Sequence, residues 1–342
     1  MILSIGIPTY NRGYVIERTI RHLLNELSPY AEKTELVVVD NCSTDDTVTV
    51  CERLLNEGLE FKFVQNEKNL GADGNFKRCV EKASGEFVWL FGSDDVPISG
   101  ALRNIINKLE GDVDNVVGLS LQYEIKEALN KPSKQKLFTP ELTTDVSISR
   151  KDLAIDKLKM SAFVKLYLGY FPFVTCNIVR RTNFLDSVKS HSVLGSGGYD
   201  FIGLFLNMLK SDSSRWRFIS NPAVLCMRED TERDDSGFYG DGAWYAFEIN
   251  AFLIKIFRSE LGHLKTIEKI LVKEFVASYI VGDLIRLKLS QASRKRQIEV
   301  LSAGSKLLGA KYLFGNLFLL SVLTVPNWIL RLIKQLRSKR VT

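Results

Sequence analysis

Hydrophobic and polar positions follow two alternating periods over the first 121 residues. Short apolar runs rich in valine, isoleucine and phenylalanine are typical of strands that are buried on both faces. Between them, apolar residues recur every three or four positions, which predicts amphipathic helices. This alternation predicts a mostly parallel, Rossmann-like α/β sheet that is doubly wound and flanked by helices. Strands are predicted at 2–8, 36–39, 61–64, 87–91 and 116–121. Helices are predicted at 15–27, 74–83 and 101–109, and a further helix is expected to follow a cap at Ser43 or Thr44.

The predicted strand at 87–91 runs directly into two adjacent carboxylates, Asp94 and Asp95. Open α/β sheets bind ligands at the edge where their parallel strands end. Because two like charges repel each other near a core, we expect a cation to complete the pair. Carboxylate oxygens suit Mg²⁺ or Mn²⁺, so both residues are candidate metal ligands. The alternative is that Ser93 or Asp94 caps the helix that follows Pro97.

Polar residues also follow the other predicted strands. A carboxylate at the end of the second strand can accept a hydrogen bond from a nucleobase N–H or amino group. Glycines at a helix start after the third strand offer backbone donors to a ligand. Each feature taken alone can be a strand end, a helix cap or an ordinary turn, but together they predict a nucleotide pocket that leads to a metal-diphosphate site. The residues are Pro8, Thr9, Tyr10, Asn11 and Arg12, then Asp40, then Asn69, Gly71 and Asn75, with Ser93 and Asp94 completing the predicted nucleotide-sugar site.

Four segments in this order, IPTYNR, VVVDNCSTDDT, NEKNLGADGNF and ASGEFVWLFGSDDV, resemble the family 2 glycosyltransferases of the glycosyltransferase-A fold. The resemblance covers about the first third of the chain. Within the family, GSDD and NLGADGNF are most similar to abequosyltransferase-type enzymes of bacterial O-antigen assembly. The resemblance implies transfer of a sugar from a nucleotide-diphosphate donor, with inversion at the anomeric carbon. It also implies that Pro8, Tyr10 and Asn11 line the nucleoside, that Asp40 reads the base, and that Asp94 and Asp95 hold the ribose and the metal.

The acidic motif departs from the family at one position. The usual aspartate two positions before Asp94 is Gly92 in this chain. The motif therefore has one carboxylate fewer, and the sequence leaves open which of Asp94 and Asp95 ligates the metal. Weak or dispensable metal binding is the alternative.

An inverting transferase needs a base that deprotonates the acceptor hydroxyl. The family places a carboxylate after a glycine-containing loop at a helix start, and Gly197-Gly198-Tyr199-Asp200 occupies that place. The resemblance thus implies that Asp200 is the base, and a helix N-cap for 201–209 is the alternative. The charged segment 227–242 predicts a loop that is either solvated or a lid over the donor. It contains further candidates for the base, Glu229, Asp230 and Asp234, and for contacts with the diphosphate, Arg228 and Arg233.

Composition and charge add a second region. The chain is 45% hydrophobic and 25% charged, which is ordinary for a globular protein with a large core. Its five cysteines lack metal-ligand spacing and lie in or beside apolar segments, which favours reduced thiols in a cytosolic protein. The chain begins directly on a predicted strand, without a charged leader. The net charge of +6 is uneven, because residues 255–342 hold 17 Lys and Arg against five Asp and Glu.

Residues 312–330 contain no charged side chain, but Pro326 interrupts the run and five basic residues follow it. A spanning helix would place these charges outside, against the positive-inside tendency. We therefore expect a helical region that lies peripherally or monotopically on the inner face of the cell membrane, with its basic residues on anionic head groups. A buried helical hairpin or a dimer interface is the alternative. The predicted regions are a nucleotide-sugar-binding half (1–122), an acceptor-binding and catalytic half of the same domain (123–243), and a helical, basic, membrane-associating region (244–342).

These features together predict a hexosyl- or deoxyhexosyltransferase that acts on a polyprenyl-diphosphate-linked glycan in bacterial surface polysaccharide (O-antigen or capsule) synthesis. Nucleic acid is not an expected partner, since the basic tail has no zinc finger, RNA-binding signature or interleaved stacking aromatics. One alternative is a sugar-nucleotide pyrophosphorylase, although IPTYNRG lacks the lysine expected in its activating loop. The other is a non-catalytic nucleotide-sugar-binding protein.

Overall fold

The computed structural model divides the chain into two compact units, Met1–Glu232 and Arg233–Thr342. It describes parts of the first unit: residues 1–126, 142–155, 159, 162–163, 166, 170–171, 173–190 and 200–227. Three predictions lie outside the described residues: the glycine loop at 195–198, the charged segment from 228 onward with its five candidate residues, and the membrane-associating region at 244–342. The predicted division into three regions stays a prediction.

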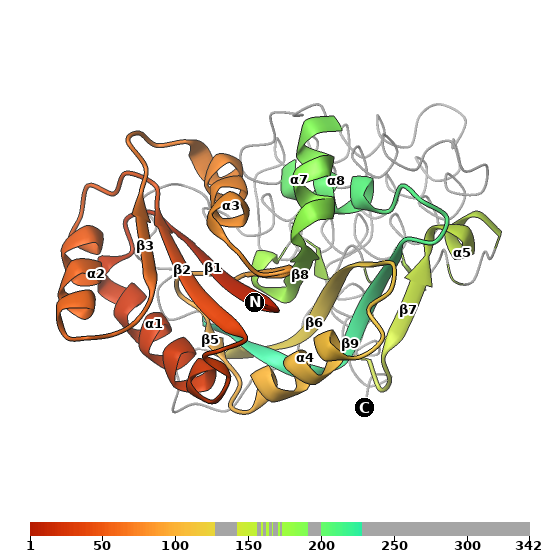
Figure 1. The fold of residues 1–342 in the computed structure, drawn as a ribbon, viewed down its shortest axis with the longest axis horizontal. Coiled ribbons are helices and arrows are strands. Elements are labelled where there is room, and N and C mark those ends of the chain that lie inside the picture. The colour runs from red at the N-terminus through yellow and green to blue at the C-terminus, as the bar shows by residue number, and fades with distance from the viewer. Residues whose placement is uncertain are drawn as a thin grey trace, which may run out of the picture. The chain divides into compact units, whose positions relative to one another are not determined.

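The described strands form one mixed sheet in the order β3-β2-β1-β4-β8-β6-β9-β5, and β7 pairs with β9 (Figure 1). The strands β3, β2, β1 and β4 are parallel to one another, whereas β8 lies antiparallel between β4 and β6. The strands are β1 (Leu3–Thr9), β2 (Thr34–Asp40), β3 (Lys62–Gln65), β4 (Phe87–Leu90), β5 (Val96–Pro97), β6 (Val116–Lys126), β7 (Val146–Ser149), β8 (Asn177–Arg180) and β9 (Arg215–Met227).

Helices cover both faces of the parallel part of the sheet, as Figure 1 shows. Alternate residues of each strand serve the two faces: Leu36 and Val38 of β2 join the core under α1, α2 and α4, while Val37 and Val39 are buried outside that cluster. The α3 helix packs against β1, β2 and β4 and also contacts α7 and α8. The described helices are α1 (Gly13–Leu27), α2 (Thr47–Asn56), α3 (Gly71–Lys82), α4 (Ala101–Glu110), α5 (Arg150–Ile155), α7 (Arg181–Ser190) and α8 (Asp200–Met208), with 3₁₀ turns η1 (Ser28–Tyr30) and η2 (Val174–Cys176).

The predicted α/β sheet with flanking helices is confirmed, and the parallel, doubly wound pattern holds through β4. Beyond β4 the sheet is mixed, because β8, which follows the 3₁₀ turn η2, enters it as an antiparallel strand. The Asn177 side chain donates to the Phe173 carbonyl at 2.9 Å and accepts from the Ser120 hydroxyl at 2.7 Å, which anchors β8 beside β6. An apolar run identifies a strand but carries no information about its direction.

Three local predictions are wrong. Neither Ser43 nor Thr44 caps α2, whose N-cap position is Asp46, because the Ser43 side chain is hydrogen-bonded to Asp40. The apolar stripe of the α2 sequence includes Leu55 and therefore predicts that Leu55 faces the core, but this residue is exposed. The capping role considered for Ser93 or Asp94 is also excluded, since β5 separates them from α4, and the N-cap position of α4 is a glycine. After the polar residues 143–145, residues 146–149 form β7 on the edge of β9.

Within the part of the chain that the structure describes, no helix is both long and apolar enough to cross a membrane.

Candidate functional site

The carboxyl ends of β1, β2 and β4 meet at one edge of the sheet. Thr9, the last residue of β1, is paired with Asp40, the last residue of β2, and the main-chain N–H of Asn41 donates to the Thr9 carbonyl at 2.9 Å. The β4 strand runs parallel on the other side of β1 and leads into Asp94 and Asp95. The structure therefore brings together the ends of three strands that the sequence identified as carrying polar residues, as ligand sites of open α/β sheets require.

Hydrogen bonds fix the loops after β1 and β2 to each other. Asn11 has a left-handed backbone (φ 52°), its N–H donates to the Ser43 hydroxyl at 2.9 Å, and its side-chain oxygen accepts from the Thr44 N–H at 2.8 Å. Ser43 in turn donates from both its N–H and its hydroxyl to the Asp40 carboxylate, which is fully buried. The Tyr10 ring between these loops is 42% exposed. The protein's own hydrogen bonds thus hold these two loops together, and Tyr10 beside them is exposed to solvent.

Four asparagines connect the loops after β2 and β3. The Asn41 side chain donates to Asn69 at 2.9 Å and to the Gly71 carbonyl at 3.2 Å. Its oxygen accepts from the Asn66 side chain at 3.2 Å, and Asn66 also donates to Asn75 at 2.9 Å. Asn41, Asn66 and Asn75 are buried, whereas Asn69 is exposed. Buried amides are costly unless they are hydrogen-bonded, and a satisfied network rigidifies the backbone around it. The predicted residues Asn69 and Asn75 therefore shape the loop through this network. Gly71 (φ 73°) is the first residue of α3, and a Cβ atom there would have no neighbour within 4 Å.

The α1 helix holds the acidic turn that follows β4. The Thr19 hydroxyl, which is buried, lies 2.9 Å from the Ser93 carbonyl and 3.0 Å from the Asp95 carbonyl. The Arg18 guanidinium donates to the Asp94 carbonyl at 2.7 Å. These contacts fix the backbone of the turn without occupying the carboxylates, so the acidic side chains are positioned by the fold.

The two carboxyls have different surroundings. Asp95 is 3% exposed; its oxygens accept from the Thr175 hydroxyl and, at 3.3 Å, from the Met227 N–H. Burial, followed by the charge of Asp94, raises the pKa of Asp95 to about 8. Asp94 is only partly buried. Asp94 is therefore the carboxylate of this pair that a solvent-borne cation reaches without breaking protein hydrogen bonds.

Gly92 stands where the family has another aspartate, and the structure leaves no room for a side chain there. A Cβ atom on Gly92 would lie 2.6 Å from Oδ2 of Asp95 and 2.8 Å from the Thr175 hydroxyl. That hydroxyl also accepts from the Gly92 N–H at 3.0 Å. Thr175, brought in by η2, thus fills the space beside the acidic turn.

We predict that Gly92→Ala is destabilising. The added methyl group must displace the Asp95 carboxyl or Thr175, and over-packing of this kind costs about 1–3 kcal/mol. Thermal unfolding of the variant measures the loss. Gly111→Ala is the matched control, because its Cβ would meet nothing closer than 3.5 Å. Equal stability of both variants would contradict the tight packing that we describe at Gly92.

Asp200 is the first residue of α8 and is 5% exposed. The cap function considered for it is supplied in part by another residue, since Oδ1 of Asp73 in α3 accepts from the Phe201 N–H at 3.3 Å. The rings of Phe76 and Phe201 meet edge to face at 5.2 Å, so the start of α8 lies beside α3. Among the described residues, Oδ1 of Asp200 has no hydrogen-bond partner, and the same is true of the buried Thr9 hydroxyl. Buried polar atoms without partners are rare and call for an explanation.

No group of three or more His, Cys, Asp or Glu side chains surrounds a common point in the described residues. Magnesium and manganese, however, commonly bind through one or two carboxylates together with substrate phosphates. The residues at the acidic turn fit a cation that is shared with a bound diphosphate, with Asp94 as the accessible ligand. They do not fit an all-protein metal cage.

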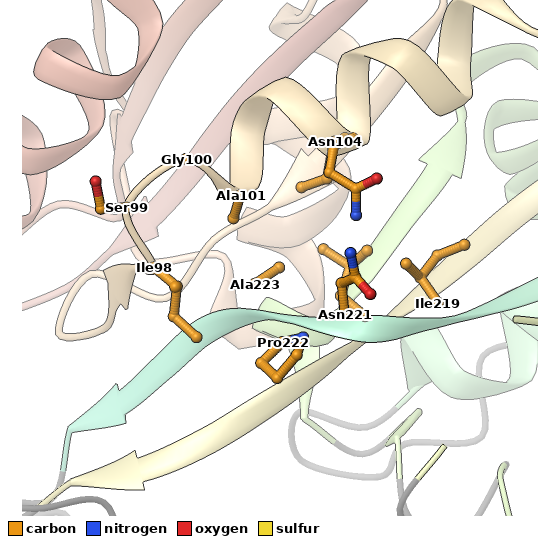
Figure 2. Close-up of a pocket in the computed structure, with 11 residues that line it drawn as sticks. Ile98, Ser99, Gly100, Ala101, Asn104, Ile219, Asn221, Pro222 and Ala223 are labelled. Atoms are coloured by element: carbon orange, nitrogen blue, oxygen red, sulfur yellow. The ribbon is translucent and has the colours of Figure 1, made fainter. Parts of the chain in front are cut away.

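A cavity of about 300 Å³ lies elsewhere, between the start of α4 and the bulged part of β9 (Figure 2). Its lining includes Asn104, Asn221 and Ala223 and contains none of the predicted site residues. In Figure 2 the side chains of Asn104 and Asn221 point toward each other. The predicted site residues therefore do not line this cavity, and those that follow the parallel strands lie at the edge of the sheet.

Several residues of the site were missed from the sequence. Thr19 stands on the apolar stripe of its helix, and Thr175 interrupts an apolar run, so a polar residue in a core position was the available signal. Asn41 and Asn66 directly follow two strands, where polar residues are common and carry little information. For Asp73 no sequence signal was available, because its partner is 128 positions away.

The model of the family described as glycosyl transferase family 2 matches residues 4–184, more than half of the chain. The mixed sheet with its flanking helices is that of a glycosyltransferase-A fold, and the chain belongs to glycosyl transferase family 2. It is accordingly a glycosyltransferase.

Two relatives illustrate the range of the family. Abequosyltransferase RfbV of Salmonella typhimurium is 24% identical over 248 residues, which cover 69% of this chain and 70% of that protein. GalNAc(5)-diNAcBac-PP-undecaprenol beta-1,3-glucosyltransferase of Campylobacter jejuni is 32% identical over 162 residues, which cover 47% of this chain and 50% of that protein. The chain thus matches about half to two-thirds of the length of these relatives.

Solved structures agree on the fold. The crystal structure of S. aureus TarS 1–349 has a TM-score of 0.57 at 18% identity and covers 91% of this chain and 82% of that one. The same protein in complex with UDP-GlcNAc has a TM-score of 0.58 at 19% identity, with the same coverage. At this identity the likeness concerns the fold alone.

Proposed function

We propose that this glycosyltransferase transfers a sugar, with inversion, from a nucleotide-diphosphate donor to a lipid-linked oligosaccharide in bacterial surface polysaccharide synthesis. One observation carries the proposal: four carboxylates from three separate segments, Asp40, then Asp94 and Asp95, then Asp200, are held after the carboxyl ends of the parallel strands or beside the start of α3. Structural carboxylates are normally satisfied by the protein, yet Oδ1 of Asp200 is buried without a partner among the described residues. Such an oxygen suits a group that receives a proton.

In this proposal the loops after β1 and β2 hold the nucleoside. The exposed Tyr10 ring provides a surface for the base, and the unpartnered Thr9 hydroxyl provides a further polar contact. Asp40 is fixed by Ser43 and shapes the polar wall of the pocket. Pro8, Asn11, Arg12, Asn69, Gly71, Asn75 and Ser93 complete the proposed donor site.

Asp94 is proposed to hold Mn²⁺ or Mg²⁺. Asp95, which accepts hydrogen bonds from Thr175 and Met227, is proposed as the supporting carboxyl of the same metal site. When bound, the cation neutralises the negative charge that develops on the departing diphosphate. Arg18 and Thr19 keep the turn in position through its carbonyl groups.

Asp200 is proposed to accept the proton of the acceptor hydroxyl. The hydroxyl oxygen then forms a bond to the anomeric carbon while the bond from that carbon to the diphosphate oxygen breaks on the opposite face. The pair of electrons leaves with the nucleoside diphosphate, and Asp200 keeps the proton until it is released to solvent. A base of this kind contributes roughly 10²–10⁴-fold to a rate.

The acceptor and location are the finer parts of the proposal. The name of the Campylobacter jejuni relative contains PP-undecaprenol, which supports a polyprenyl-diphosphate-linked glycan as the acceptor here. The basic residues of the segment 255–342 support attachment to anionic lipid on the inner face of the cell membrane.

A thermal-shift screen of nucleoside diphosphates with and without Mn²⁺ tests the donor site. Ligand at a hundred times its dissociation constant stabilises a protein by about 2.7 kcal/mol, so the preferred base will raise the melting temperature most, and more with Mn²⁺ than without. Release of that nucleoside diphosphate from its sugar derivative then tests catalysis. Consumption of nucleoside triphosphate and sugar phosphate instead would indicate a pyrophosphorylase, and binding without turnover across acceptors would indicate a non-catalytic protein. No stabilisation by any nucleotide would refute the proposal.

A further inference from the structure

We propose that Asp73 is a positioning residue: it holds the first turn of α8, and with it Asp200, against the loop that binds the donor. The inference rests on the proposed function, because it assigns Asp200 the role of base. It concerns a residue of the segment NLGADGNF, within which the sequence suggested donor contacts only for Asn69, Gly71 and Asn75.

The contact that carries the inference joins two helices. The first N–H groups of an α-helix have no partner within the helix and are usually capped by the residue just before it. In α8 the Phe201 N–H donates to Oδ1 of Asp73, at 3.3 Å, from the first turn of α3. A carboxylate at this place also interacts favourably with the positive end of the helix dipole. The cap of α8 thus comes from an element 128 positions earlier in the chain.

The other end of this connection is the donor loop. Two residues before Asp73, the Gly71 carbonyl accepts from the Asn41 side chain at 3.2 Å, and the Leu70 N–H donates to the oxygen of the same side chain at 2.8 Å. Asn41 directly follows Asp40 at the end of β2. Hydrogen bonds and short backbone segments therefore connect the end of β2, through the start of α3, to the start of α8.

Apolar contacts make the junction stiff. Phe201 is 2% exposed, and its ring meets Phe76 of α3 at 5.2 Å and Phe205 of α8 at 5.3 Å. The Phe76 contact joins α8 to α3, the Phe205 contact orients the Phe201 ring within α8, and Asp73 holds the N-terminal end of the helix. Asp200 is the neighbour of Phe201, so a displacement of the Phe201 N–H moves the Asp200 carboxyl with it.

We expect Asp73→Ala to lower kcat by roughly ten- to a hundredfold, since misplacement of a catalytic group by about 1 Å costs up to that much. The KM for the donor and the stabilisation by nucleoside diphosphate should change little. Asp73→Asn keeps the side-chain oxygen and should restore most of kcat. Glu81→Ala removes another carboxylate from the exposed side of α3 and is the matched control, with kcat unchanged.

Hydrogen exchange of the α8 amides, measured on the full chain, gives a readout that does not depend on activity. Faster exchange at the start of α8 in Asp73→Ala, and exchange close to that of the unmodified protein in Asp73→Asn, are expected. Normal kcat in Asp73→Ala, loss of nucleotide binding together with kcat, or an Asp73→Asn variant as impaired as the alanine variant would each overturn the inference. A protein that binds donor but transfers no sugar in its unmodified form would refute the proposed function instead, and the exchange data would still decide whether Asp73 holds α8.

Discussion

Asp94→Ala is expected to lower kcat for sugar transfer by roughly 10²–10³-fold, the usual cost of removing one group that stabilises charge in a transition state. Asp94 is the partly exposed carboxylate of the acidic turn, and no cluster of other ligands in the described residues would replace it. The backbone of the turn is held by Arg18 and Thr19 through carbonyl groups, so the variant should keep its fold. Steady-state transfer rates over a range of Mn²⁺ concentrations measure the effect.

Two comparisons sharpen this result. Asp212→Ala removes a carboxylate from the exposed turn before β9 and should leave transfer unchanged. Asp95→Ala should also abolish transfer, but with a lower melting temperature, because it leaves the buried Thr175 hydroxyl and Met227 N–H without their acceptor. Rates within a factor of two of the unmodified enzyme in both Asp94→Ala and Asp95→Ala would remove the metal-diphosphate role from this turn.

Asp200→Asn should lower kcat by roughly 10²–10⁴-fold while donor binding and melting temperature stay close to those of the unmodified protein. The amide has nearly the same shape as the carboxyl but cannot accept the acceptor's proton. The buried Oδ1 of Asp200 has no partner among the described residues, so the fold loses little when the charge is removed. Single-turnover transfer, measured beside nucleotide-induced thermal shifts, separates chemistry from binding.

The same variant distinguishes a base from a helix cap. If Asp200 served only the start of α8, asparagine, which caps helices about as well as aspartate, would keep nearly full activity. The Phe201 N–H already has an acceptor in Asp73, which makes a purely capping role for Asp200 less necessary. Full activity of Asp200→Asn would move the search for the base to Glu229, Asp230 and Asp234.

Most of the first half of the fold was predictable because each element carries its own signal. The apolar runs at β1, β2 and β4 and the apolar stripes of α1 and α4 are local patterns, and buried parallel strands separated by helices allow few arrangements. The element boundaries moved by only a few residues. The antiparallel insertion of β8 and the long strand β9 were not predicted, because their direction and neighbours depend on contacts with residues far away in the chain.

The site divides in the same way. One predicted strand ends at Asp40 and another leads into Asp94. The order of residue types alone therefore identifies the edge of the sheet where a ligand is expected to bind. That Asp95 is buried against Thr175, and that Gly92 has no room for a side chain, depends on η2 reaching β4 from 80 positions away. The asparagine network and the Asp73 contact are likewise products of distant segments meeting.

The order of apolar runs, helical stripes and polar strand ends was therefore enough to determine the class of fold and the edge of the sheet where the polar strand ends meet, and the resemblance of four short segments indicated the family. Those properties come from short-range patterns, and each is repeated several times along the chain. Only the tertiary structure decided that Asp94 is accessible, that Asp95 is buried with a raised pKa, and that Asp200 begins a helix whose first turn contacts α3. These depend on burial and on hydrogen bonds between segments up to 132 residues apart, and the free energy of a charged group is set by such surroundings more than by its neighbours in sequence.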